Sequence, residues 1–188
     1  MKKLYVALIA CLSATIAFCE TTNATETPET IPELKRVETR QVEYTNFALG
    51  GENYIDVVGL RLAFVGRCHD ITGLDLSIAG QAQNAYGLQL ALLRNKVYDR
   101  AEALQIAIFN NSADRLDGVQ VSLVNDTSVG RGLQVGLVNI GDDFTGFQLG
   151  AINTTNTMEG YQVGLINVIK SSNWFSTLPI LNIGFRDL

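Results

Sequence analysis

The sequence GVQVSLVN begins at Gly118, and the related sequences GLQVGLVN, GFQLGAIN and GYQVGLIN begin at Gly132, Gly146 and Gly160. The same phrase therefore returns every fourteen residues. Large apolar residues alternate in it with Gln and with a small residue, and this period of two is typical of a β-strand. Self-similarity at a fixed short period indicates a repeat protein, in which each unit is stabilised by its neighbours.

The array extends in both directions from these four units. Earlier units begin at Gly59, Gly73, Gly87 and Ala103, and we interpret Phe175 to Asn182 as a degenerate ninth unit. Successive units start fourteen or fifteen residues apart, except for a step of sixteen after Gly87. The sequence therefore predicts an all-β protein.

Each unit is described here by counting its leading residue as position one. Positions two, four and six carry large apolar residues, so we expect them to form the buried face of a strand. Position five holds only Ala, Ser or Gly in the first eight units, and it is Pro179 in the degenerate ninth. Position three is Gln in six units, namely Gln89, Gln105, Gln120, Gln134, Gln148 and Gln162. Most units close with an Asn, and these residues are Asn110, Asn125, Asn139, Asn153, Asn167 and Asn182.

Two architectures are compatible with such strands. In a β-solenoid of about nine 14-residue coils, equivalent positions stack about 4.8 Å apart, and Asn or Gln side chains form ladders. In a small antiparallel outer-membrane β-barrel, each unit is one strand with a turn, and polar and apolar residues also alternate.

Three features favour the solenoid. Neighbouring strands of a meander run in opposite directions, so they give no reason for Asn to recur at one strand end. The residue two before most leading residues is apolar, which indicates a core on the return side of a coil. The strands of seven or eight residues are also shorter than the roughly 9–11 that a membrane-spanning barrel strand needs. The leading Gly and the closing Asn suit corners, since both residue types tolerate positive φ.

The column of Gln residues has two interpretations. It is either a structural ladder or a flat, amide-rich surface for recognition. Such a surface would bind a repetitive ligand such as a glycan, an envelope or host surface protein, or another copy of the chain. The column of Asn residues is interpreted as a structural ladder.

The residues before the repeats divide into two segments. Residues 1–19 resemble a secretory signal peptide, with Lys2 and Lys3 before an apolar run and a small-residue cleavage site. A lipoprotein anchor at Cys11 is the alternative. Residues 20–45 are rich in Thr, Glu and Pro and are expected to form a disordered linker. The β-repeat domain is then predicted at 46–188, with a C-terminal cap at 174–188 that includes Trp174 and Pro179.

The composition excludes some functions. The formal net charge is −5, which argues against nucleic-acid binding, because phosphates require clustered Lys and Arg. His69 is the single histidine, and its neighbours Cys68 and Asp70 do not complete a catalytic or metal-binding motif. Hence no catalytic, cofactor-binding or metal-binding residues are predicted.

The GhQhGhhN phrase (h, apolar), followed by Pro-Ile-Leu-Asn-Ile-Gly-Phe near the C-terminus, resembles a family of bacterial surface repeat-containing proteins. The resemblance covers about Gly59 to Phe185. It implies export to the cell surface, the periplasm or the outer membrane, and it brings no established activity. We therefore expect a non-enzymatic structural or interaction module.

Overall fold

A computed structural model describes residues 40–51, 55–172 and 176–185 of the 188-residue chain. The chain divides into two units, residues 1–38 and 39–188, and all the described residues belong to the second. The predicted signal peptide, Cys11 and residues 20–39 of the predicted linker lie outside the described residues, as do Trp174 and Phe175.

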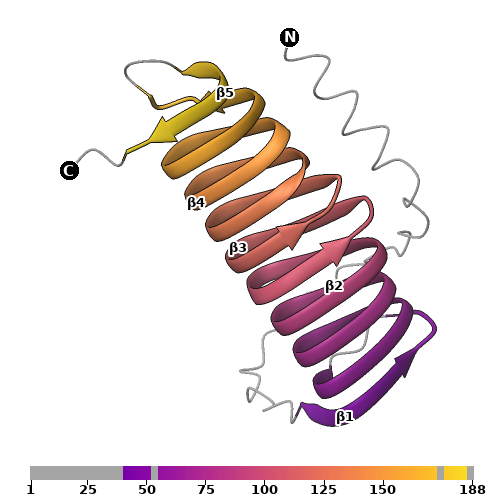
Figure 1. Ribbon diagram of the computed structural model, residues 1–188. Helices are drawn as coiled ribbons and strands as arrows, with labels where there is room; N and C mark the ends of the chain where they lie inside the picture. Colours follow the sequence, from indigo (N-terminus) through magenta and orange to yellow (C-terminus); the bar gives the residue numbers. More distant parts are fainter. Residues whose placement is uncertain (1–39, 52–54, 173–175, 186–188) are drawn as a thin grey trace, which may run out of the picture. The chain divides into compact units, whose positions relative to one another are not determined.

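The described residues form an all-β solenoid of about seven turns, whose coils stack along one axis (Figure 1). Its strands are β1 (Gln41–Ala48), β2 (Ile55–Ala107), β3 (Asn110–Val121), β4 (Val124–Ile169) and β5 (Thr177–Gly184). The long strands β2 and β4 pass through several coils. They belong to one sheet in the order β1-β2-β3-β4-β5, and the first four pair in parallel. Parallel pairing is the arrangement expected of a solenoid and not that of an antiparallel barrel.

Equivalent positions of successive units lie beside each other. Gly118 pairs with Gly132, and Gln120 pairs with Gln134, so the register between β3 and β4 is fourteen residues. Such pairing of like with like is the geometry that allows side-chain ladders.

The number of coils is smaller than the nine expected from the sequence. The segment interpreted as a ninth unit does not continue the stack, because β5 runs antiparallel to the end of β4. Between Gly164 and Asn167 the register of this pair shifts, and the opposing residue Ile180 has a φ of 69°. Pro179 lies next to this irregularity and has no N–H to donate to a further strand. The stack therefore ends at a reversed strand.

The N-terminal end of the stack begins before the predicted domain boundary at residue 46. Strand β1 starts at Gln41 and pairs in parallel with the first coil, with Phe47 beside Leu62. The last residues of the range assigned to the linker, 41–45, are therefore part of the sheet. Their polar and apolar residues already alternate, and a neighbouring strand supplies their backbone hydrogen bonds.

The leading glycines occupy tight corners, as predicted. Gly132 has a φ of 126°, and a Cβ at this position would meet the carbonyl oxygen of Gly118. Larger residues are excluded by both the backbone conformation and this close approach. The corresponding prediction for Asn is wrong, because Ile180 is the single non-glycine residue with positive φ among the described residues. The Asn residues act through their side chains instead.

Each coil has a front side, formed by positions one to six, and a return side, formed by the remaining positions. The interior of the return side is apolar, as the sequence predicted. Its core includes Val57, Ile71, Ala85, Ala101, Leu116, Phe144 and Met158, all buried. Side-chain sizes are complementary in this core. Gly130 has no side chain, and the ring of Phe144 fills the space beside it.

The front side is the reverse of the expectation. Gln134 has no exposed surface, whereas its apolar neighbours Leu133 and Val135 are partly exposed and Leu137 is 57% exposed. Positions three and five therefore point into the coil, and positions two, four and six point outward. Position five is small because the Asn column crosses it, and a Cβ at Gly150 would lie 2.7 Å from Nδ2 of Asn139.

Candidate functional site

The six predicted Gln residues form one buried ladder inside the front side. Except in Gln89, the first of the six, each amide nitrogen donates to the amide oxygen of the preceding coil, as from Gln105 to Gln89 at 2.7 Å and from Gln134 to Gln120 at 2.9 Å. The other distances are between 2.7 and 2.8 Å, and no member is more than 1% exposed. Buried amides require such partners, because an unpaired one costs about 1–3 kcal/mol. The column therefore stabilises the coil and is not an exposed recognition surface.

A second buried ladder consists of Asn residues. Its members are Asn95, Asn111, Asn125, Asn139, Asn153 and Asn167, joined at 2.7 to 3.2 Å. Most also donate to a backbone carbonyl of the next coil, as Asn125 does to Val135 at 2.8 Å. The column thus ties the front side to the corner that follows it.

The membership of the Asn ladder differs from the prediction at both ends. Asn111, and not Asn110, occupies the column, while the side chain of Asn110 donates to the carbonyl of Val124. Asn95 was not predicted because its unit lacks the usual spacing. Asn182 lies on β5 and donates to the backbone carbonyl of Asn167 at 3.4 Å, outside the side-chain ladder.

The two ladders run in opposite directions. Gln amides donate toward the N-terminal coils and Asn amides toward the C-terminal coils. Because every amide carries a dipole, the two columns oppose each other along the stack. The donor end of the Gln ladder reaches a carboxylate, since Gln89 donates to Asp75 at 3.5 Å.

The first two coils replace Gln with an ion pair. Nη1 of Arg61 lies 3.2 Å from Oδ2 of Asp75, with both side chains at most 1% exposed. The pair joins position three of two adjacent coils. Room for it comes from Gly66 and Gly80, which stand where later units have Asn. Burial raises the pKa of Asp75, and Arg61 acts in the opposite direction.

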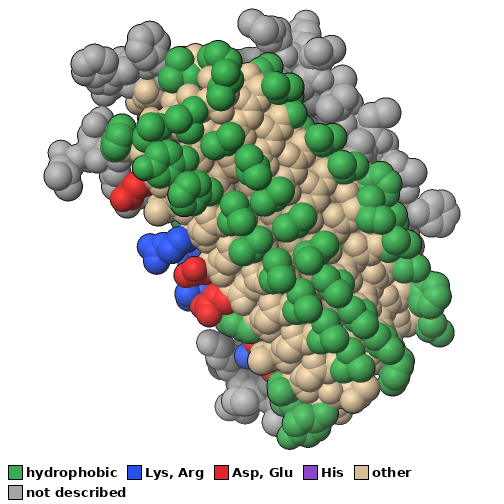
Figure 2. Space-filling view, viewed as in Figure 1, with side chains coloured by type: hydrophobic (Ala, Val, Ile, Leu, Met, Phe, Trp, Pro, Cys, Tyr) green, Lys and Arg blue, Asp and Glu red, His purple; other side chains and the backbone are tan. Residues whose placement is uncertain are grey.

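The outward positions of the front side form a continuous surface, which we call the apolar front face. It consists of positions two, four and six in the eight units that start between Gly59 and Gly160. Its members are Leu60, Leu62, Phe64, Leu74, Leu76, Ile78, Leu88, Leu90, Leu92, Leu104, Ile106, Ile108, Val119, Val121, Leu123, Leu133, Val135, Leu137, Phe147, Leu149, Ala151, Tyr161, Val163 and Leu165. None of these side chains is charged. Figure 2 shows hydrophobic side chains across this face, with charged groups gathered at one edge.

The apolar front face is large for a soluble domain. Leu165 is 74% exposed, Phe64 59% and Leu92 53%. Phe147 and Tyr161 add a stacked aromatic pair with ring centroids 5.1 Å apart. The largest exposed apolar patch on a typical monomer is about 300–600 Å². Eight strands about 4.8 Å apart, each contributing about 20 Å of length, give roughly 750 Å².

The outer surface of the return side has the opposite character. It carries the charged turn residues, including Asp99, Arg115, Asp142, Asp143 and Glu159. The segregation of charge to one side is the signal in the sequence that identifies the apolar front face. The apolar front face was not predicted from the sequence, because its apolar positions were assigned to the core.

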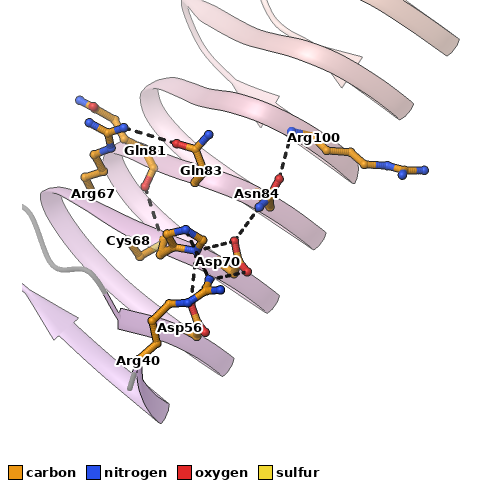
Figure 3. Close-up of polar contacts among 10 residues, drawn as sticks. Arg40, Asp56, Arg67, Cys68, Asp70, Gln81, Gln83, Asn84 and Arg100 are labelled. Atoms are coloured by element: carbon orange, nitrogen blue, oxygen red, sulfur yellow. Dashed lines mark hydrogen bonds and ion pairs between the residues drawn. The ribbon is translucent and has the colours of Figure 1, made fainter. Parts of the chain in front are cut away.

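A polar cluster lies on the return side of the first coils (Figure 3). Nη1 of Arg40 donates to Nδ1 of His69 at 2.7 Å and lies 3.6 Å from carboxylate oxygens of Asp56 and Asp70. Asn84 donates to Asp70 at 2.8 Å and continues the cluster to the next coil. One ligand atom each from Asp56, His69 and Asp70 lies within 4.8 Å of the others, as in a metal site. The guanidinium of Arg40 already supplies a cation to these groups.

Cys68 lies in the return-side core and is a free thiol. Burial raises its pKa from 9.0 to about 11, although nearby Arg61 lowers it. The thiol is therefore neutral at physiological pH and is a poor nucleophile or metal ligand.

Comparisons with protein-family models, with curated proteins and with solved structures find no match to this chain. A search of the described residues for helices that are long and apolar enough to cross a membrane finds none. The functional assignment below accordingly rests on the geometry of the coils and on the sequence.

Proposed function

We propose that this protein is a non-enzymatic, exported module of the cell surface or envelope that binds its partner through the apolar front face. The observation that carries this proposal is the inverted front side, with amides inside and an uncharged apolar surface outside. Parallel sheets in proteins are usually covered on both faces. Among the described residues, nothing covers one face of this sheet, and a partner would supply the missing layer.

The interior polar groups support a structural role for the ladders. Apart from the buried oxygens of Asn95 and Gln162 at the ladder ends, their amide donors and acceptors bond to each other, to the backbone and to neighbouring buried side chains, so they are not free to bind a substrate. The regular stack provides a rigid support that fixes the relative positions of the outward side chains. Such a support suits recognition over an extended flat area.

The contact surface is tested by placing charges on it. We compare the full chain with Leu137→Lys and with Val129→Lys, a matched control because Val129 is 52% exposed on the return side. The ligand is an environment-sensitive hydrophobic dye, and circular dichroism checks the fold. The dye is titrated at nanomolar protein concentration, so that self-association does not cover the face. Under these conditions we expect the parent and Val129→Lys to bind the dye, and Leu137→Lys to bind it several-fold more weakly. Equal binding by all three proteins would contradict the proposed contact surface.

Export is tested separately, because it depends on residues outside the described structure. The full chain is expressed in a bacterium, and the N-terminus of the protein in the envelope or medium is determined by mass spectrometry. Cleavage after Cys19 supports the signal peptide, whereas a lipid-modified N-terminus at Cys11 supports the lipoprotein anchor. The Cys11→Ala variant separates the two, since it abolishes only the second. An uncleaved protein retained in the cytoplasm would refute export.

A further inference from the structure

We propose that the partner on the apolar front face is a second copy of this chain, packed face to face as a twofold dimer. This inference rests on the proposed function and names the occupant of the same surface. In the dimer, the front sheets of two solenoids would form the two layers of a sandwich, each covering the uncovered face of the other.

The charge distribution favours a second copy over a lipid surface. The apolar front face has no charged side chain, so two copies meet without repulsion across the interface. Peripheral membrane contacts usually combine apolar residues with Lys and Arg that attract anionic lipids. This face offers no such cations, and the chain has a net charge of −5. Glycan binding would need hydrogen-bonding groups, and Tyr161 is the single face member with a hydroxyl.

The shape of the surface favours the same occupant. Outward side chains stand in rows that repeat at the strand spacing of about 4.8 Å. A surface whose side-chain rows have the same spacing can fit its ridges between these rows. The apolar front face of a second copy is such a surface. Sheets pack face to face about 10 Å apart with strands inclined by about 30°. Leu, Val and Ile, the commonest members here, are the residues that fill such layers.

The area is sufficient for a stable dimer. At roughly 750 Å² from each copy, the interface would bury about 1,500 Å² in total, within the usual 1,200–2,000 Å² of specific complexes. The end strands extend it further. Phe47 of β1 is 73% exposed, and Leu181 of β5 is 45% exposed. They pair with Leu62 and Val163, which are members of the face.

The test is the mass of the full chain in solution, measured by sedimentation equilibrium. We expect a dimer at micromolar concentration. The double variant Leu137→Lys/Leu149→Lys alters two exposed positions on adjacent coils without touching the interior. It should weaken dimerisation at least about 100-fold, since each lysine loses an apolar contact and is left buried without a partner. Val129→Lys should remain a dimer.

A monomeric parent would overturn the inference, and so would dimers that all three proteins form equally. The second result would point to association at the open edges of β1 or β5. Dye binding separates these failures from failure of the proposed function. Suppose that the parent is monomeric, that its apolar front face binds the dye, and that the double variant does not bind it. The proposed contact surface is then supported, and the proposed second copy is refuted. If neither dimer nor dye binding depends on the face, both proposals fall.

The twofold symmetry gives an independent check. In a face-to-face dimer whose twofold axis runs across the stacking direction, a residue near the centre of the array meets its own copy, whereas a residue at one end meets the other end. In a Cys11→Ser/Cys19→Ser/Cys68→Ala background, Val121→Cys should form a disulfide-linked dimer rapidly under mild oxidation. Leu62→Cys should not link to itself but should link to Val163→Cys when the two are mixed. Equal cross-linking at the centre and the ends would refute this symmetry.

Discussion

The first two coils and the later coils fill the same buried column in different ways. Later coils use Gln, which carries both a donor and an acceptor, so identical residues bond to each other over any number of coils. The first two coils use Arg61 and Asp75, which bond as a pair but could not continue as a stack of like charges. A buried column of polar side chains is thus compatible with a stable fold when its donors and acceptors have hydrogen-bond partners. The charged pair ends the series of Gln residues.

The C-terminal end of the same column differs again. The amide nitrogen of Gln162 donates to Gln148 at 2.8 Å, but its oxygen is buried without a hydrogen-bond partner. The Asn column is completed there, since Asn167 donates to the carbonyl of Leu178 on β5. The Gln ladder therefore meets an ion pair at one end, where Nε of Arg61 and Oδ1 of Asp75 lack partners, and ends in an unpartnered amide oxygen at the other. Three predictions test this comparison.

The largest effect is expected from Asp75→Ala. It leaves the guanidinium of Arg61 buried without its counter-charge, which costs about 3–5 kcal/mol of unfolding free energy. Urea unfolding followed by circular dichroism measures the change. The double variant Arg61→Gln/Asp75→Gln extends the neutral ladder into the first coils and should recover most of the loss. A double variant as unstable as Asp75→Ala would show that the first coils require the charges themselves.

A smaller effect is expected from interrupting the ladder. Gln134→Leu leaves the oxygen of Gln120 and the nitrogen of Gln148 unpaired, at about 1–3 kcal/mol for each group. Gln162→Leu at the end of the ladder removes the donor to Gln148 and the weaker contacts to Thr155 and the carbonyl of Val168. It leaves no amide nitrogen unpaired, and it also removes the unpartnered oxygen of Gln162. Chemical denaturation should therefore show a loss for Gln134→Leu roughly twice that for Gln162→Leu. Equal losses would mean that the ladder relaxes around a gap.

The smallest effect concerns Cys68, which lies close to the ion pair. Its folded pKa of about 11 exceeds the ordinary 9.0, so the unfolded state loses the proton first as the pH rises. The stability that this group contributes is full below about pH 9 and is lost as the pH rises toward 11. Between pH 8 and 10 the parent should lose about 1 kcal/mol more than Cys68→Ala. Parallel stability profiles for the two proteins would contradict the raised pKa.

Much of the fold could be predicted from the sequence because the period leaves few alternatives. The leading Gly residues and the return-side core were both placed from spacing and residue type. Which side chains of the front side point inward could not be predicted, since a period of two distinguishes two faces of a strand but does not identify the inner one. General experience favours apolar residues inside. Here the amides lie inside because stacking places each one beside an identical residue that supplies its hydrogen bonds. These hydrogen bonds can be inferred only when the alignment of the coils is known.

The Asn ladder illustrates a second limit. Counting from Ala103 gives Asn110, but the extra residue of this unit precedes the ladder position, which moves the side chain in the column to Asn111. Two adjacent Asn residues offer no means of choosing between them by type. The choice depends on where the coil accommodates its insertion.

The unequal unit lengths have a consequence for folding. Coils that match like with like are exposed to slippage, because a unit displaced by fourteen residues meets the same Gly, Gln and Asn and gains almost the same bonds. The units that start at Gly87 and Ala103 are sixteen and fifteen residues long. A chain slipped by fourteen residues would put Gln beside apolar side chains at the fifteen-residue unit and two residues away from its partner at the sixteen-residue unit. These two irregular units lie in the middle of the array. Together with the two ends, whose sequences differ from the repeat, they restrict the coils to a single register.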